Sequence, residues 1–129
     1  MSDKSNPIAI VEDNTPIRKL FSTLLKKAGH QIIEFENGES AMEGLKNTSV
    51  STIILDILLP DRNGSDMIGE LRGIKGYDKI PIIAITGFAQ ASDRQKFIDL
   101  GFDAYLAKPI NTSSFVEEIN TIRDEKFKK

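Results

Sequence analysis

Short apolar runs alternate along the chain with longer stretches in which apolar residues recur at helical spacing. Five of the runs have the length of buried strands, and they cover residues 8–11, 31–35, 51–56, 80–85 and 104–106. Each run is followed by a stretch with the period of an amphipathic helix. Because crossovers between parallel strands are right-handed and cover the sheet, five such units in series predict an α/β fold with a single doubly wound parallel sheet.

The first helical stretch has the most regular pattern. Asn14 precedes it as a capping residue, and Pro16 stands where a missing backbone N–H costs least. Gly29 provides a stop. The apolar positions between them form one stripe, which consists of Ile17, Leu20, Phe21, Leu24, Leu25 and Ala28.

Similar signals predict the later helices. Asn37 opens the second helix, and the fourth is expected over residues 90–100 with Gly101 at its end. Asn111 or Thr112 is expected to cap the last helix. Its inward positions would be Phe115, Val116, Ile119 and Ile122.

Composition limits the classes of partner. The chain has 129 residues, of which 40% are hydrophobic and 28% charged, which suits one ordinary domain with a sizeable core. A net charge of −2 gives no general attraction to nucleic acid or to an anionic membrane, so neither is expected as a partner. Because the chain has no cysteine, disulfides, thiolate metal sites and thiol nucleophiles are excluded.

No stretch of the sequence has the character of a membrane span or a secretion signal. The apolar run at residues 80–85 is too short to cross a bilayer, and residues 1–7 lack the apolar core of a signal peptide. We therefore expect a cytoplasmic protein. Residues 1–6 are expected to be a disordered N-terminus, residues 7–123 the domain, and residues 124–129 a frayed basic tail.

Polar residues stand at the ends of four apolar runs. Asp13 follows the first run with Glu12 beside it, and Asp56 ends the third. Thr86 follows the fourth run, and Lys108 follows the fifth. The carboxyl ends of parallel strands meet at one edge of the sheet, where ligands bind in this architecture. These residues are therefore expected to form one site.

Three carboxylates at one point cannot all stay ionised without a cation or a raised pKa. The oxygen ligands of Glu12, Asp13 and Asp56, facing water, suit Mg²⁺. With Lys108 as a fixed positive charge, the site favours a phosphoryl group once a divalent metal is bound. Asp56 can then act as a nucleophile and form an aspartyl phosphate, which the Thr86 hydroxyl can contact.

Four motifs together resemble the receiver domain of two-component response regulators. They are Ile10-Val11-Glu12-Asp13-Asn14, Leu55-Asp56-Ile57-Leu58-Leu59-Pro60 with Gly64, Ala84-Ile85-Thr86-Gly87 and Tyr105-Leu106-Ala107-Lys108-Pro109. The resemblance extends from Pro7 to Ile122, which is nearly the whole chain. Each motif alone is weak, but their joint order and spacing are highly specific. The string Thr86-Gly87-Phe88-Ala89 also resembles stand-alone receivers of the DivK type.

The resemblance implies a CheY-like, flavodoxin-like (βα)5 fold with strand order 2-1-3-4-5. It implies that Asp56 accepts a phosphoryl group from a phosphohistidine of a histidine kinase or histidine phosphotransfer protein. Such a domain is a signalling phosphoacceptor and not an enzyme, apart from self-catalysed phosphotransfer and slow autodephosphorylation.

The resemblance also assigns a metal set. Asp13, Asp56 and the backbone carbonyl of Leu58 would bind Mg²⁺ directly, and Glu12 would act through water. Mn²⁺ would substitute for Mg²⁺.

Three more residues receive roles from the same resemblance. Lys108 would pair with the phosphoryl group, and its peptide bond to Pro109 would be cis. Thr86 would move to hydrogen-bond the phosphoryl group, and Tyr105 would turn inward as Thr86 moves. This switch would alter a protein-docking face made by the fourth helix, the fifth strand and the fifth helix, in a monomer or a weak dimer.

Leu58 and Phe88 are apolar at positions that are often polar in this family. Both would flank the path of the water that attacks the aspartyl phosphate. We expect them to exclude water and to prolong the phosphorylated state. An alternative for Phe88 is simple packing on the neighbouring helix.

Three other functions fit parts of the pattern. A phosphatase of the aspartyl-phosphate type needs a second acid two residues after the nucleophile, where this chain has Leu58. An FMN carrier needs a phosphate-binding loop after the first strand, and none is present. A pseudo-receiver is disfavoured because the site residues are intact. After the last helix only residues 124–129 remain, so the chain is either a protein that signals by docking or a receiver excised from a longer one, and the sequence leaves both open.

Overall fold

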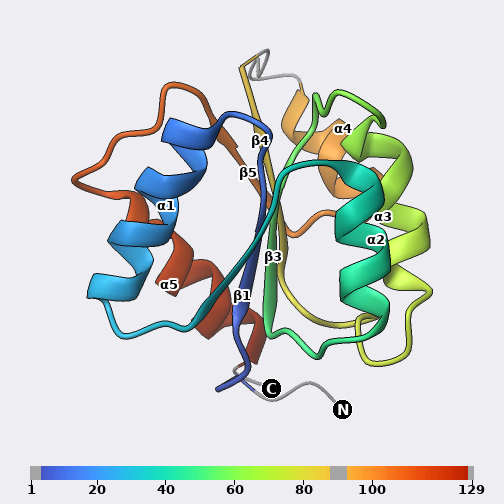
Figure 1. Cartoon of the computed structure of the whole chain (residues 1–129), viewed down its shortest axis with the longest axis horizontal. Coiled ribbons are helices and arrows are strands. Elements are labelled where there is room, and N and C mark those ends of the chain that lie inside the picture. Colours follow the sequence, from blue (N-terminus) through green and yellow to red (C-terminus); the bar gives the residue numbers. More distant parts are fainter. Residues whose placement is uncertain (1–3, 88–92, 128–129) are drawn as a thin grey trace.

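A parallel sheet of five strands forms the centre of the molecule (Figure 1). The computed structural model describes residues 4–87 and 93–127. The strands are β1 (Ile8–Val11), β2 (Ile32–Phe35), β3 (Thr52–Asp56), β4 (Ile82–Thr86) and β5 (Ala104–Ala107). Their order is β2-β1-β3-β4-β5, and each adjacent pair is parallel. The predicted α/β class and strand order are confirmed.

Helices cover both faces of the sheet. One face carries α1 (Thr15–Lys27) and α5 (Phe115–Phe127), as Figure 1 shows. The other carries α2 (Gly38–Lys46), α3 (Gly64–Arg72) and α4 (Asp93–Leu100). No helix in the described part of the chain is both long and apolar enough to span a membrane.

The strands supply two separate cores. Every residue of β1, β3 and β4 is buried, as expected for strands covered on both sides. Successive residues point to opposite faces, so Ile54 joins the core under α1 and α5, whereas Leu55 joins the core on the other face. In the first of these cores the rings of Phe21 and Phe115 stack with centroids 4.8 Å apart.

The predicted caps place the starts of α1 and α2. The Asn14 side chain accepts a hydrogen bond from the N–H of Ile17 at 3.0 Å, and Asn37 accepts one from Ser40 at 2.8 Å. Gly29, beyond the end of α1, has a φ of 97°, a conformation that glycine adopts without steric cost.

Two predicted boundaries differ from the structure by two residues or more, and several strand ends differ by one. The last helix begins at Phe115 and not directly after Asn111 or Thr112, because Asn111 accepts a hydrogen bond from the N–H of Ser113 and so closes a separate turn. The fourth strand begins at Ile82, later than predicted. The predicted start of the fourth helix, at residue 90, lies outside the described residues.

Residues on both sides of the predicted domain limits make contacts. Lys4 pairs with Asp124 at 2.9 Å, and its carbonyl accepts a hydrogen bond from Arg123 at 2.9 Å. Lys126 pairs with Asp103 at 2.7 Å. The limits at residues 7 and 123 stay a prediction, and described residues beyond each of them pack on the domain.

Two glycines inside helices give a matched pair of stability predictions. A Cβ at Gly69 of α3 would meet nothing within 4 Å beyond its chain neighbours and its own helix backbone, whereas a Cβ at Gly44 of α2 would lie 2.3 Å from the Phe35 ring. We expect Gly69→Ala to raise the free energy of unfolding by about 0.5–1 kcal/mol, because alanine loses less backbone entropy on folding. Gly44→Ala should lower it, because Phe35 must move. Urea unfolding measures both, and a Gly69→Ala protein no more stable than wild type would contradict the prediction.

Candidate functional site

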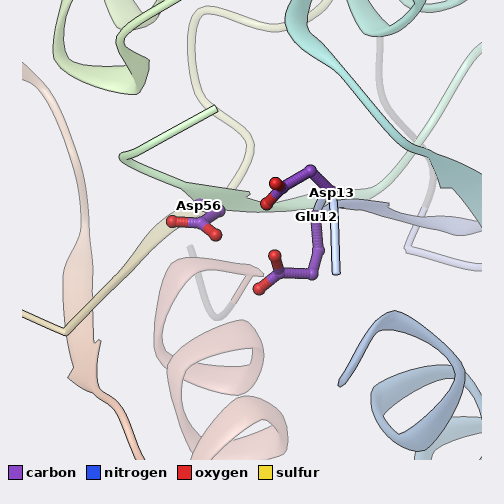
Figure 2. Close-up of side chains that lie close together, drawn as sticks. All are labelled: Glu12, Asp13 and Asp56. Carbon is purple, nitrogen blue, oxygen red and sulfur yellow. The ribbon is translucent and has the colours of Figure 1, made fainter. Parts of the chain in front are cut away.

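Three carboxylates converge at the carboxyl edge of the sheet (Figure 2). Glu12 and Asp13 directly follow β1, and Asp56 is the last residue of the adjacent strand β3. One carboxylate oxygen from each lies within 4.8 Å of the others. Glu12 is 1% exposed and Asp56 4% exposed, while Asp13 is exposed to solvent. The cluster is therefore buried at its base and open on one side.

Lys108 supplies a positive charge to the two buried carboxylates. Its Nζ lies 2.7 Å from Oε1 of Glu12 and 2.8 Å from Oδ2 of Asp56. The Lys108 backbone N–H donates to the carbonyl of Thr86 at 2.9 Å, so the end of β5 is fixed to the end of β4. The peptide bond between Lys108 and Pro109 is cis.

Burial and contacts within the cluster shift the pKa of Glu12 and of Lys108. Burial is the main reason why the pKa of Glu12 rises from its ordinary value of 4.5 to about 7, and the neighbouring Asp56 raises it further against the effect of Lys108. Burial disfavours the charged form of Lys108, but its hydrogen bonds to Asp56 and Glu12 outweigh this and raise its pKa. Glu12 is therefore protonated more easily, and Lys108 loses its proton less easily, than the same groups in solvent.

The segment after β3 is folded closely around Asp56. The N–H of Leu58 donates to Oδ1 of Asp56 at 3.1 Å, and the N–H of Gly64 donates to the carbonyl of Ile57 at 2.7 Å. A Cβ at Gly64 would lie 2.8 Å from the carbonyl oxygen of Asp56, so a larger residue would push this segment away. The Leu58 side chain is 51% exposed beside the site.

Thr86 and Tyr105 lie on the strands next to Asp56. Thr86 ends β4, which pairs with β3 and places Ile85 opposite Asp56. Thr86 is 3% exposed. Tyr105, on β5, is half-buried, and its ring centroid lies 5.6 Å from that of Phe97 in α4. The structure thus brings together all the strand-end residues that the sequence singled out, while Phe88 lies outside the described residues.

Arg18 is a buried residue of the site that the sequence analysis missed. Its guanidinium donates to the carbonyl of Glu12 at 2.8 Å and to Oε1 of Glu34 at 3.1 Å. Burial opposes ionisation of Glu34, but its hydrogen bonds to Lys19 and Arg18 lower its pKa overall. The position of Arg18, next to Ile17 at the margin of the apolar stripe, was the only available signal. A charge there usually lies in solvent.

The donor set fits Mg²⁺. All candidate ligands are oxygens, two carboxylates are buried, and the exposed Asp13 leaves an open side on which a cation can keep water molecules. With all groups ionised the cluster has an excess of negative charge, which a divalent cation neutralises.

Comparison with known proteins identifies the family. The family model for the response regulator receiver domain matches residues 8–120. The chain belongs to this family. Phosphorylation of an aspartate is the general mechanism of these receiver domains, which act in two-component signalling as phosphoacceptors and not as conventional enzymes.

Two relatives show different settings for such a receiver. The chain is 33% identical over 114 residues to the polar-differentiation response regulator DivK of Brucella anthropi, and the match covers 88% of this chain and 93% of DivK. It is 37% identical over 121 residues to hybrid signal transduction histidine kinase I of Dictyostelium discoideum. That match covers 88% of this chain but only 7% of the kinase.

Solved receiver structures have the same fold. A CheY-like response regulator receiver domain protein from Methanospirillum hungatei JF-1 superposes with a TM-score of 0.85 at 25% identity, and the match covers 95% of this chain and 97% of that chain. The receiver domain of the sensor histidine kinase PA1611 from Pseudomonas aeruginosa PAO1 has a TM-score of 0.80 at 26% identity, with 96% and 98% covered. That structure contains a magnesium ion coordinated in the active site cleft.

The raised pKa of this receiver's Glu12 predicts a pH-dependent stability. Between pH 4.5 and 7 the unfolded chain loses the Glu12 proton while the folded chain retains it. Stability from this residue therefore falls as pH rises through that window and is constant above it. In buffer without Mg²⁺, the free energy of unfolding of Glu12→Gln relative to wild type should rise by about 1–3 kcal/mol between these pH values.

Urea unfolding at a series of pH values measures this effect. Glu43→Gln is the control, since Glu43 is an exposed residue of α2, and it should follow the wild-type profile. A stability difference between Glu12→Gln and wild type that does not change with pH would show that Glu12 titrates normally.

Proposed function

We propose that Asp56 is the residue that accepts the phosphoryl group, from a phosphohistidine of a histidine kinase or histidine phosphotransfer protein. The observation that supports this most is its place in the cluster. Asp56 contacts Lys108 at 2.8 Å, shares the oxygen cluster with Glu12 and Asp13, and accepts a hydrogen bond from Leu58.

The site residues suit an in-line transfer. A carboxylate oxygen of Asp56 forms a bond to phosphorus while the bond from phosphorus to the imidazole nitrogen breaks, and the electron pair leaves with the imidazole. Lys108, which already contacts Asp56, balances the charge on the phosphoryl oxygens. The reaction therefore needs alignment and charge neutralisation but no protein base.

We propose Mg²⁺ as the cofactor, with Mn²⁺ as a substitute. Asp13, Asp56 and the Leu58 carbonyl would hold it directly, and Glu12 would hold it through water. When bound, it neutralises charge on the transferring group. The all-oxygen donor set supports this, as does the magnesium in the cleft of the similar Pseudomonas receiver.

We propose that Thr86 and Tyr105 transmit the signal. Thr86 would hydrogen-bond the phosphoryl group, and Tyr105 would turn inward and change the face formed by α4, β5 and α5, where a downstream protein docks. The contact between Tyr105 and Phe97 of α4 supports this route. A switch from 1:99 to 99:1 needs about 5.5 kcal/mol of differential stabilisation, and a few charge-assisted contacts are of that size.

The proposed setting is the cytoplasm, with residues 7–123 as the receiver, in a monomer or a weak dimer. The net charge of −2 supports an output through proteins and not through direct binding to nucleic acid.

Phosphorylation from a small donor tests the proposed acceptor. Incubation with acetyl phosphate and Mg²⁺ should add one phosphoryl group to the wild type, seen by intact mass, because the site itself catalyses the transfer. Asp56→Asn should abolish this addition. Asp66→Asn, which changes an exposed acid in the first turn of α3, should leave it intact. No mass gain in the wild type, or a full gain in Asp56→Asn, would reject the assignment.

The exposed Leu58 predicts a long phosphate lifetime. Replacing Leu58 and Phe88 with asparagine should admit water and shorten the half-life of the aspartyl phosphate by about tenfold, equivalent to about 1.4 kcal/mol in the barrier. Loss of the mass increment over time measures it. Leu20→Asn is the control, because Leu20 is also exposed, at 42%, but lies on α1. An unchanged half-life in the double variant would show that these two side chains do not protect the aspartyl phosphate from water.

A further inference from the structure

The segment between β3 and α3 is closed on itself. The N–H of Gly64 donates to the carbonyl of Ile57 at 2.7 Å, and Leu58 and Asn63 form an isolated antiparallel bridge. Asn63 also caps α3, since its side chain accepts a hydrogen bond from Ser65. This segment carries the Leu58 carbonyl, so its placement relative to Asp56 determines one proposed metal ligand.

Asp61, within this segment, contacts a helix far away in the sequence. One carboxylate oxygen accepts the N–H of Gly38 and the other accepts the N–H of Glu39, each at 2.8 Å. Both donors belong to the first turn of α2, where free N–H groups and the helix dipole favour a negative charge. The hydrogen bonds from Gly38 and Glu39 hold the pKa of Asp61 below its usual range.

The segment also lies close against α2 and α3. A Cβ on Gly38 would lie 3.0 Å from Cβ of Arg62, so there is no room there for a larger residue without displacement. Arg62 in turn forms an ion pair with Glu70 of α3. The segment is thus fixed to α2 at Asp61 and to α3 at Arg62.

We propose that Asp61 is a positioning residue for the metal site: it holds the β3–α3 segment against the start of α2 and so keeps the Leu58 carbonyl in place beside Asp56. This inference rests on the proposed function, because it takes the Leu58 carbonyl as a metal ligand. Asp61 itself contacts α2 and not the metal.

Removal of the two hydrogen bonds should weaken Mg²⁺ binding. Titration of the full chain with Mg²⁺ alone, followed by calorimetry or by amide NMR signals, should show a dissociation constant about 3–10-fold higher for Asp61→Ala, below the loss typical of residues that hydrogen-bond a metal ligand directly. Should Asp61→Ala fail to fold, Asp61→Asn retains one accepting oxygen and replaces it in this comparison.

Two controls separate positioning from simpler causes. Asn37→Ala removes the other side-chain acceptor at the start of α2 but leaves the β3–α3 segment tied, so it should destabilise the fold without changing Mg²⁺ affinity. Glu39→Gln removes one negative charge from the same turn and keeps the backbone N–H that donates to Asp61. It should also leave Mg²⁺ affinity unchanged.

Linkage provides a readout that a purely structural role would not affect. If Asp61 favours Mg²⁺ binding through its hydrogen bonds, bound Mg²⁺ must strengthen those bonds by the same factor. Hydrogen exchange of the Gly38 and Glu39 amides should therefore slow when Mg²⁺ is added to the wild type. The amide of Ser40, which is bonded to Asn37, should change less.

The possible outcomes separate a failure of the positioning role of Asp61 from a failure of the proposed function. A wild type that binds no Mg²⁺ overturns both. A wild type that binds Mg²⁺, with Asp61→Ala equal to it, overturns the positioning role and leaves the proposed function standing. An equal loss of affinity in Asn37→Ala or Glu39→Gln also overturns it, because helix stability or charge would then be the cause.

Discussion

Burial of two carboxylates beside one ammonium group is the constraint on which this site depends. Glu12 and Asp56 are almost inaccessible to solvent, and carboxylates in such a position stay ionised only with a compensating partner such as a cation in contact. Lys108, which follows β5, provides this contact. It does so although β3 and β4 lie between β5 and β1 in the sheet. The contact is possible because parallel strands end at the same edge. The sheet topology therefore determines which charged groups meet at the site.

The single positive charge of Lys108 does not balance the three carboxylates, and this makes the site suitable for a further cation. With every group ionised, Glu12, Asp13, Asp56 and Lys108 carry an excess of negative charge. The pKa of Glu12 is raised mainly because the residue is buried, and the neighbouring Asp56 raises it further. A divalent cation removes the same excess without a proton. Proton binding at Glu12 and binding of the proposed Mg²⁺ both lower the negative charge of the cluster, so we expect the proposed metal site also to have a pH-dependent stability.

Local signals in the sequence predicted most of the fold and the strand-end residues. The spacing of the apolar residues predicted the strand–helix units, and Asn14 and Asn37 predicted the starts of two helices. Both signals act between residues that are close in the chain. Strand order came from the family resemblance alone, since periodicity does not encode it. The start of α5 was placed too early because Asn111 closes a local turn instead of capping the helix. The buried Arg18 and the link from Asp61 to α2 could not be predicted, because each depends on segments that meet only in the folded molecule.

Apart from the contacts of Lys108 with Glu12 and Asp56, the two sides of the site are held by different kinds of interaction. On the side of β1 and β3, Arg18 donates to the Glu12 carbonyl, and Asp61 accepts hydrogen bonds that hold the segment after Asp56 against α2. Hydrogen bonds to charged groups therefore fix the backbone beside the acidic residues. On the side of β4 and β5, the Tyr105 ring packs on Phe97 of α4. Rearranging a contact between aromatic rings costs less free energy than leaving a buried charge without its partner. A change at Asp56 is therefore expected to leave the β1–β3 side in place and to be accommodated toward α4. The proposed route of the signal, through Tyr105 toward α4, agrees with this difference in how the two sides are held.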